Sequence, residues 1–211
     1  CYQIQNVLSG LIKMFNKDEM IKIFDELFIQ SKIHYNDFNE ADGKIGDGDL
    51  GITIQNGFQE IVNNKDNFND DLGHNFMLCS QAFVKKSGSS FGTLIAFCLM
   101  NISKSLKGKK LLTHGNIIEI FEICIKTIKE RGKTNLGDKT ILDTLDFILN
   151  KIKEKKDNIK YSEIFKSSTK EALNSFKGKK ILIGRARMFE EKTKDFDDPG
   201  MLALSKLAEG F

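Results

Sequence analysis

The feature that most constrains this chain is a helical spacing of apolar residues that recurs over almost its whole length. Apolar side chains return at intervals of three and four residues, which places them on one face of an α-helix. The stretches NIIEIFEICIKTIKERG and KTILDTLDFILNKIKEKK are the clearest, each with an apolar stripe opposite Lys and Glu. The pattern predicts helices near residues 3–15, 18–38, 50–64, 73–86, 91–106, 115–131, 138–155, 162–177 and 199–210.

Helix boundary signals agree with these limits. Asp198 followed by Pro199 is a favourable helix start, and Asp138 is a second candidate N-cap. Gly132 and Gly178 lie where C-terminal caps belong. Only the short run KKILIGRAR has the character of a β-strand. We therefore expect one all-α domain of eight or so helices over residues 1–211.

Composition excludes several classes of protein. No apolar run approaches the roughly 18–20 residues that span a bilayer, and the first 15 residues lack the basic region and cleavage pattern of a signal peptide. The 32 basic and 29 acidic residues nearly balance at a net charge of +3, with Lys scattered among Asp and Glu. This distribution predicts a cytoplasmic protein with neither a nucleic acid nor a membrane as its partner.

The cysteines predict no metal or disulfide framework. There is no CxxC pair, and three of the four cysteines lie in apolar helical stretches. We expect buried reduced thiols. The four are Cys1, Cys79, Cys98 and Cys124.

The loop GKIGDGDLGIT, preceded by Asp42, combines four glycines with three carboxylates. Asp42, Asp47 and Asp49 offer hard oxygen ligands suited to Mg²⁺ or Ca²⁺. An EF-hand is excluded, because a loop starting at Asp47 would have Gly51 at position five and Phe58 at position twelve, where a bidentate Glu is required. A metal loop and a solvated turn both remain open from this stretch alone.

Three further segments interrupt the helical pattern with glycine. SGSSFGT at residues 87–93 opens directly into an apolar helix, as a phosphate-binding helix start does. GDKTILD follows at residues 137–143, and a segment at 184–200 supplies Arg185, one of three arginines in the chain. No GxxxxGK[ST] sequence occurs, which excludes a P-loop kinase. If the helices run up and down, these junctions gather at one end and form a site.

In this order the four segments resemble the nucleotide-binding L subunit of dihydroxyacetone kinase, the DAK2 or DhaL family. The resemblance covers about residues 40–202. The matching motifs are D-x4-D-G-D-x-G from Asp42, G-x-S from Gly88 followed by FGT, RGK from Arg131, GDKT-x-x-D from Gly137, GRA from Gly184 and DPG from Asp198.

The resemblance implies a fold and a set of site residues. The fold would be an eight-helix antiparallel up-and-down α-barrel with a nucleotide at one end. ADP or ATP would be held through two Mg²⁺ ions, whose implied ligands are Asp42, Asp47 and Asp49. The implied nucleotide-binding residues are Leu50, Gly51, Ile52, Thr53, Ser89, Ser90, Gly132, Ile141, Arg185, Asp198, Pro199 and Gly200.

The resemblance also implies a function and partners. The chain would be the nucleotide subunit of a phosphotransferase that is active only with a partner. A separate K subunit would hold a small hydroxyketone. The phosphoryl donor would be free ATP, or a bound ADP rephosphorylated by an M subunit of the phosphotransferase system. Two alternatives remain: a kinase subunit for another polyol or a carried fatty acid, and a non-enzymatic reporter of nucleotide state that binds a transcription regulator.

The chain departs from the best-known members of this family at four places. Leu50 stands where His is frequent, and Thr53 where Asn is common. The Ser/Gly loop is about three residues shorter, and a Pro usual after GDKT-x-x-D is missing. These departures leave the acceptor open.

Overall fold

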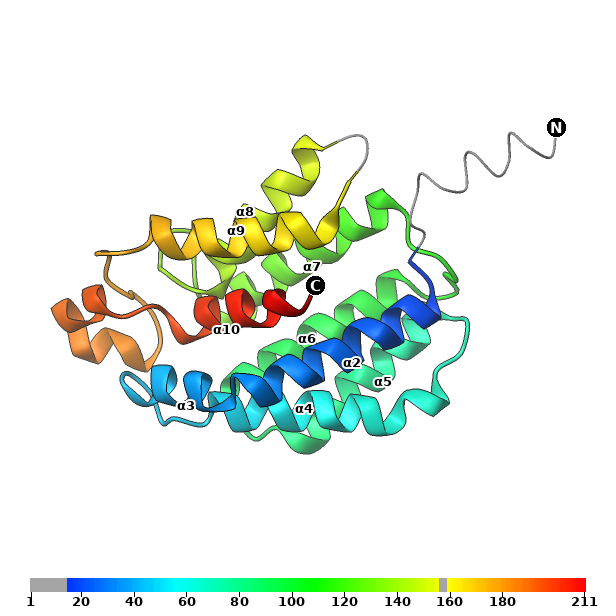
Figure 1. Ribbon diagram of the computed structural model, residues 1–211, viewed down its shortest axis with the longest axis horizontal. Helices are drawn as coiled ribbons and strands as arrows, with labels where there is room; N and C mark the ends of the chain where they lie inside the picture. Colours follow the sequence, from blue (N-terminus) through cyan, green and yellow to red (C-terminus); the bar gives the residue numbers. More distant parts are fainter. Residues whose placement is uncertain (1–14, 156–158) are drawn as a thin grey trace.

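Helices wind through almost all of the computed structural model, which describes residues 15–155 and 159–211 (Figure 1). Within these residues the only β-type pairing is an isolated bridge between Phe15 and Leu112. The α-helices are α2 (Lys17–Ile33), α3 (Tyr35–Gly43), α4 (Leu50–Asn64), α5 (Leu72–Lys86), α6 (Ser90–Ser105), α7 (His114–Gly132), α8 (Ile141–Glu154), α9 (Tyr161–Ser175) and α10 (Pro199–Leu207). Short 3₁₀ helices are η1 (Lys65–Asn67), η2 (Arg185–Asp195) and η3 (Ala208–Gly210).

The helices close into a ring. From α4 to α10 each α-helix packs against the next one in the chain, α2 packs against α4, and α10 returns to contact α2 and α3. Figure 1 shows α7, α8 and α9 on one side of α10, and α2, α4, α5 and α6 on the other. The predicted all-α, up-and-down antiparallel barrel is confirmed.

One predicted helix is broken in the structure, and another lies almost entirely outside the described residues. The segment predicted at 18–38 is broken at His34 into α2 and α3; the Nδ1 atom of His34 lies 2.8 Å from Oδ2 of Asp37, in the first turn of α3. The helix predicted near 3–15 falls outside the described residues except for Phe15.

The run at residues 179–187, whose composition has the character of a β-strand, forms no strand. Residues 179–184 form a loop, and residues 185–187 are the first three residues of η2. No strand lies beside them in the part of the chain that the structure describes, so the backbone has other partners: the amide of Ile181 donates to Oγ1 of Thr193, and that of Leu182 to the carbonyl of Asp138. The apolar character of this run is explained by the burial of Ile181, which packs with Ile45 and Ala186 in a small cluster separate from the main core.

Some of the predicted helix caps are confirmed and others are wrong. Asp198 caps α10 with Pro199 at its first position, as predicted. The cap of α8 is Thr140 rather than Asp138, because Thr140 and Asp143 form a reciprocal capping box. Gly132 is the last residue of α7 and the left-handed residue is Lys133, whereas Gly178 does adopt a positive φ of 74° beyond α9.

The core fills the space between the helices. Its largest cluster is centred on α4, α5 and α6 and includes the fully buried Phe38 and Phe83. Cys79, Cys98 and Cys124 are free thiols; Cys79 and Cys98 are buried as predicted, whereas Cys124 is half-buried. None of the described helices combines the length and the apolar character that crossing a bilayer requires.

The four glycine-interrupted segments meet at one end of the barrel. They are the α3–α4 loop, the start of α6, the α7–α8 loop, and the region from residue 181 to the start of α10, and residues from all four line a single cavity. In Figure 1 this is the end where α3 lies close to the loops that precede α10. The predicted convergence of the junctions is confirmed.

Candidate nucleotide and metal site

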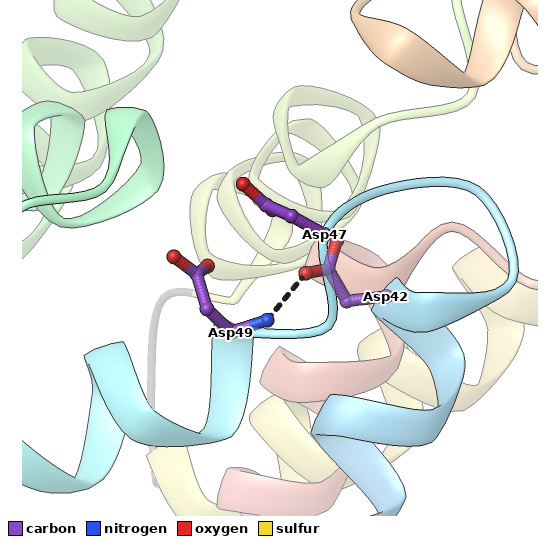
Figure 2. Close-up of side chains that lie close together, drawn as sticks. All are labelled: Asp42, Asp47 and Asp49. Carbon is purple, nitrogen blue, oxygen red and sulfur yellow. Dashed lines mark hydrogen bonds between the residues drawn. The ribbon is translucent and has the colours of Figure 1, made fainter.

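Three aspartates converge at the α3–α4 loop. Asp42 lies in the last turn of α3, Asp47 in the loop, and Asp49 immediately before α4. One carboxylate oxygen of each lies within 4.8 Å of those of the other two (Figure 2). Oδ2 of Asp42 also accepts a hydrogen bond of 3.0 Å from the amide of Asp49, which fixes the two ends of the loop together. Of the two interpretations left open by the sequence, the geometry favours a metal loop.

Glycine is required at two positions in this loop. Gly48 has a φ of 75°, in the left-handed region that side chains disfavour. At Gly46, an added Cβ would lie 2.4 Å from Oδ1 of Asp42. The backbone at Gly46 therefore packs directly against the carboxylate of Asp42.

Replacing Gly46 by Ala should impair metal binding more than folding. The new methyl group must displace the Asp42 carboxylate, and it would also lie 3.0 Å from the carbonyl oxygen of Asp42. We expect Mg²⁺ affinity to fall by about tenfold with less than about 1 kcal/mol of lost stability. Gly43→Ala is the matched control, because a Cβ there meets only the Cα of Gly48 at an ordinary 3.8 Å. Titration of Mg²⁺-dependent stabilisation measures both; equal affinities in the two variants would contradict the expectation.

The negative charge of the three aspartates favours the binding of a cation. Burial raises the pKa of the Asp49 carboxyl above its usual value, and the carboxylates of Asp47 and Asp42 raise it further. Arg185 opposes them: its guanidinium is paired with Asp47 and lowers the pKa of Asp49. Oxygen-only ligands with excess negative charge suit Mg²⁺ or Ca²⁺. The three residues present therefore fit a hard divalent ion.

The start of α6 faces this cluster across the cavity. Ser89 is the N-cap and its Oγ accepts from the amide of Gly92 at 3.1 Å, so the helix begins at Ser90. The hydroxyl of Thr53 donates to the same Oγ at 2.8 Å, which ties the start of α4 to the start of α6. A helix N-terminus with small residues beside it favours an anionic group.

The cavity measures about 420 Å³. Most of the predicted site residues line it: Asp42, Asp47, Asp49, Leu50, Ser89, Ser90, Gly132, Ile141, Arg185, Asp198, Pro199 and Gly200. The other three, Gly51, Ile52 and Thr53, lie in the first turn of α4 outside this lining. The amide of Gly51 is already bonded to Oδ1 of Asn39 at 2.7 Å, and the side chain of Ile52 is 44% exposed.

The cavity also has an apolar part that sequence reasoning did not identify. It is lined by Phe91, Leu94, Ile128, Ile181 and Ile183. Leu94 and Ile128 belong to the apolar faces of α6 and α7, where sequence periodicity does not separate core from cavity wall. The cavity lining thus combines acidic side chains, apolar side chains and a helix N-terminus.

A second pair of carboxylates lies at the cavity wall: Asp198 lines the cavity, and the nearby Asp143 does not. Oδ1 of Asp198 accepts from the amide of Met201 at 2.9 Å, and burial raises the pKa of Asp198 to about 7, with the nearby charge of Asp143 adding to the rise. Asp143 accepts from the amides of Gly137 and Thr140 at 2.6 and 2.8 Å, yet burial still raises its pKa. These groups hold backbone in place rather than reach into the aspartate cluster.

Comparisons with known proteins agree with this arrangement. A family model described as the DAK2 domain matches residues 44–211. The chain is 30% identical over 109 residues to the ADP-binding subunit DhaL of PEP-dependent dihydroxyacetone kinase 1 from Listeria innocua, covering 50% of this chain and 53% of that protein. It is 25% identical over 103 residues to the ADP-binding subunit DhaL from Escherichia coli, covering 48% of this chain and 49% of that one. The chain thus spans about half the length of these curated relatives.

A solved structure shares the fold. The dihydroxyacetone kinase of C. freundii superposes with a TM-score of 0.71 at 19% identity, over 90% of this chain and 33% of that one. The family model covers most of this chain, including the aspartate loop from residue 44 onward and every other cavity segment. The chain belongs to the DAK2-domain family.

Proposed function

We propose that the cavity binds ADP or ATP through two Mg²⁺ ions held by Asp42, Asp47 and Asp49. The observation that carries this proposal is the convergence of three carboxylates, to within 4.8 Å of one another, at the edge of a cavity that a helix N-terminus also enters. Acidic ligands for cations, amide groups for phosphate and an apolar wall for a base are the three parts that a magnesium-bound nucleotide requires.

The relatives support this proposal. The bacterial DhaL proteins are named as ADP-binding subunits. The C. freundii kinase has a structure in complex with AMP-PNP and Mg²⁺, with a TM-score of 0.69 at 19% identity. In our proposal the phosphates of the nucleotide lie between the aspartate loop and the start of α6, near Ser89 and Ser90. The base lies against Ile141 and Gly132, and Leu50, Gly51, Ile52 and Thr53 border the phosphates.

The residues of this chain would act by positioning and by neutralising charge. Bound Mg²⁺ would supply charge neutralisation at the phosphate oxygens. The Arg185 guanidinium, now paired with Asp47, lies where it would meet phosphate once the cations satisfy that carboxylate. Asp198, Pro199 and Gly200 would close the opposite wall. No side chain is needed as a covalent nucleophile, because phosphoryl transfer depends mainly on alignment and electrostatic stabilisation.

We further propose that the chain is one domain that serves as the nucleotide subunit of a dihydroxyacetone-type kinase in the cytoplasm. A separate K subunit would present the small hydroxyketone. The donor would be exchangeable ATP or, with an M subunit of the phosphotransferase system, a bound ADP that is rephosphorylated in place. The names of the PEP-dependent relatives favour the second route.

Reconstitution tests this function. The purified chain is combined with K subunits and with either ATP or a phosphotransferase-system M subunit and its phosphoryl donor. We expect phosphorylation of dihydroxyacetone that requires Mg²⁺ and all the components of one donor route. Tight binding of Mg²⁺ and ADP without turnover, with every donor and the cognate K subunit, would refute the kinase function while leaving the nucleotide site intact.

A further inference from the structure

Lys139, in the sequence GDKT, is a buried lysine with no place in the site described above. Its side chain is 1% exposed and it does not line the cavity. Nζ donates three hydrogen bonds to backbone carbonyls: to Lys179 at 2.8 Å, to Thr193 at 3.1 Å and to Phe196 at 2.6 Å. Lysine is almost never fully buried unless it is paired. Three acceptors around one nitrogen require three N–H donors, which only the protonated ammonium has.

The three carbonyls belong to the two ends of one segment, residues 179–196, which we call the strap. Two further bonds hold the same region: the Ile181 amide donates to Oγ1 of Thr193, and the Leu182 amide to the Asp138 carbonyl, both at 3.0 Å. One ammonium group therefore joins the beginning of the strap to its end, beside the α7–α8 loop.

The first half of the strap forms part of the wall of the candidate site. Ile181 and Ala186 pack with Ile45 of the aspartate loop in a separate apolar cluster. Arg185 is paired with Asp47, and Ile183 lines the cavity with them. The place of the Arg185 guanidinium over the aspartate loop thus depends on where the strap is held.

We propose that Lys139 is a positioning residue, whose ammonium group anchors the strap and thereby holds Arg185 over the aspartate loop. The part of this proposal that concerns nucleotide affinity rests on the proposed function; the anchoring itself does not.

The surroundings explain why a charged group is stable here. Burial lowers the pKa of Lys139, and the nearby carboxylates of Asp197, Asp198 and Asp195 oppose that change. The outer face of the strap is open to solvent, with Leu182 53% exposed. If the ammonium is removed, the three carbonyls regain hydrogen bonds to water when the strap opens. The loss of stability is therefore confined to the strap.

Hydrogen exchange of the ligand-free protein tests the anchor. In Lys139→Met, peptides within residues 179–196 should exchange at least about tenfold faster than in the wild type, while α4, α5 and α6 keep their protection. Lys192→Met is the matched control, since it removes a charge from an exposed position of the same segment and should change nothing. If Lys139→Met cannot be purified, Lys139→Gln, which retains two N–H donors but no charge, should still exchange faster than the wild type in the same peptides. Unchanged strap exchange, or faster exchange throughout the protein, would overturn the proposal.

A double-mutant cycle tests the link to Arg185. We expect Arg185→Met and Lys139→Met each to weaken the binding of ADP in Mg²⁺ by about tenfold, the effect of one lost charged hydrogen bond. In the Arg185→Met background, Lys139→Met should add less than about twofold, because its effect passes through the absent guanidinium. Independent losses that multiply to about a hundredfold would show that Lys139 does not act through Arg185. If the wild type itself binds no ADP, the proposed function fails, and hydrogen exchange still decides whether Lys139 anchors the strap.

Discussion

Replacing Asp47 by Ala is expected to abolish the stabilisation of this protein by ADP in Mg²⁺. A ligand at about 100 times its dissociation constant stabilises the folded protein by roughly 2.7 kcal/mol. Asp47 supplies one of three converging carboxylates and is the partner of Arg185. Its loss removes one ligand and lowers the negative charge of the site, which weakens cation binding by the two remaining aspartates. The thermal shift with Mg²⁺ and ADP should therefore be clear in the wild type and almost absent in the variant.

The ligand-free variant provides an internal check. The pair between Arg185 and Asp47 is largely solvent-exposed, so losing it should cost no more than about 1 kcal/mol. The melting temperatures without ligand should accordingly be similar. Asp66→Ala, at an exposed carboxylate in η1, is the control that should respond to ligand as the wild type does. Equal ligand-induced shifts in Asp47→Ala and the wild type would refute the metal assignment.

Replacing Asp198 by Asn should stabilise the ligand-free protein at alkaline pH and leave it unchanged in acid. The folded-state pKa of Asp198 is raised from 3.8 to about 7, mainly by burial. The unfolded chain therefore releases this proton at lower pH than the folded one. The contribution of Asp198 to the free energy of unfolding falls as the pH rises from about 4 to about 7 and then levels off. An Asn cap retains the bond to the Met201 amide without the charge.

Chemical denaturation across pH measures this difference. At pH 8 the variant should be more stable than the wild type by about 2 to 4 kcal/mol, and at pH 4 the two should agree. A variant that is equally or less stable at pH 8 would contradict the raised pKa. The Asp198 variant therefore tests the electrostatics of the cavity wall without any ligand.

The helical barrel could be predicted from the sequence because its signal is repeated in every helix. Apolar spacing gave the helices, and the glycine-interrupted junctions indicated which loops gather at one end. The aspartate loop could also be predicted, because its signal is local. Its geometry requires glycine at positions 46 and 48, and these glycines can be read directly from the sequence. The structure adds that the oxygens of the three carboxylates lie within 4.8 Å of one another.

The remaining features depend on contacts between distant parts of the chain. Ile181 has the character of a strand residue, yet it is buried in a loop, because Ile45 lies about 136 residues away in sequence and packs against it. Lys139 reads as one more polar loop residue until its three carbonyl partners, 40 to 57 residues further on, are seen. Ile128 and Leu94 differ from core residues only by the cavity in front of them. Periodicity carries no information about such partners.

The most direct test of a magnesium-nucleotide site is a crystal structure grown with ADP and Mn²⁺, whose anomalous scattering locates the cations. We predict two anomalous peaks in contact with Asp42, Asp47 and Asp49, with the phosphates between these peaks and the start of α6 at Ser90. Peaks elsewhere, or ADP bound outside the cavity that these residues line, would contradict the account.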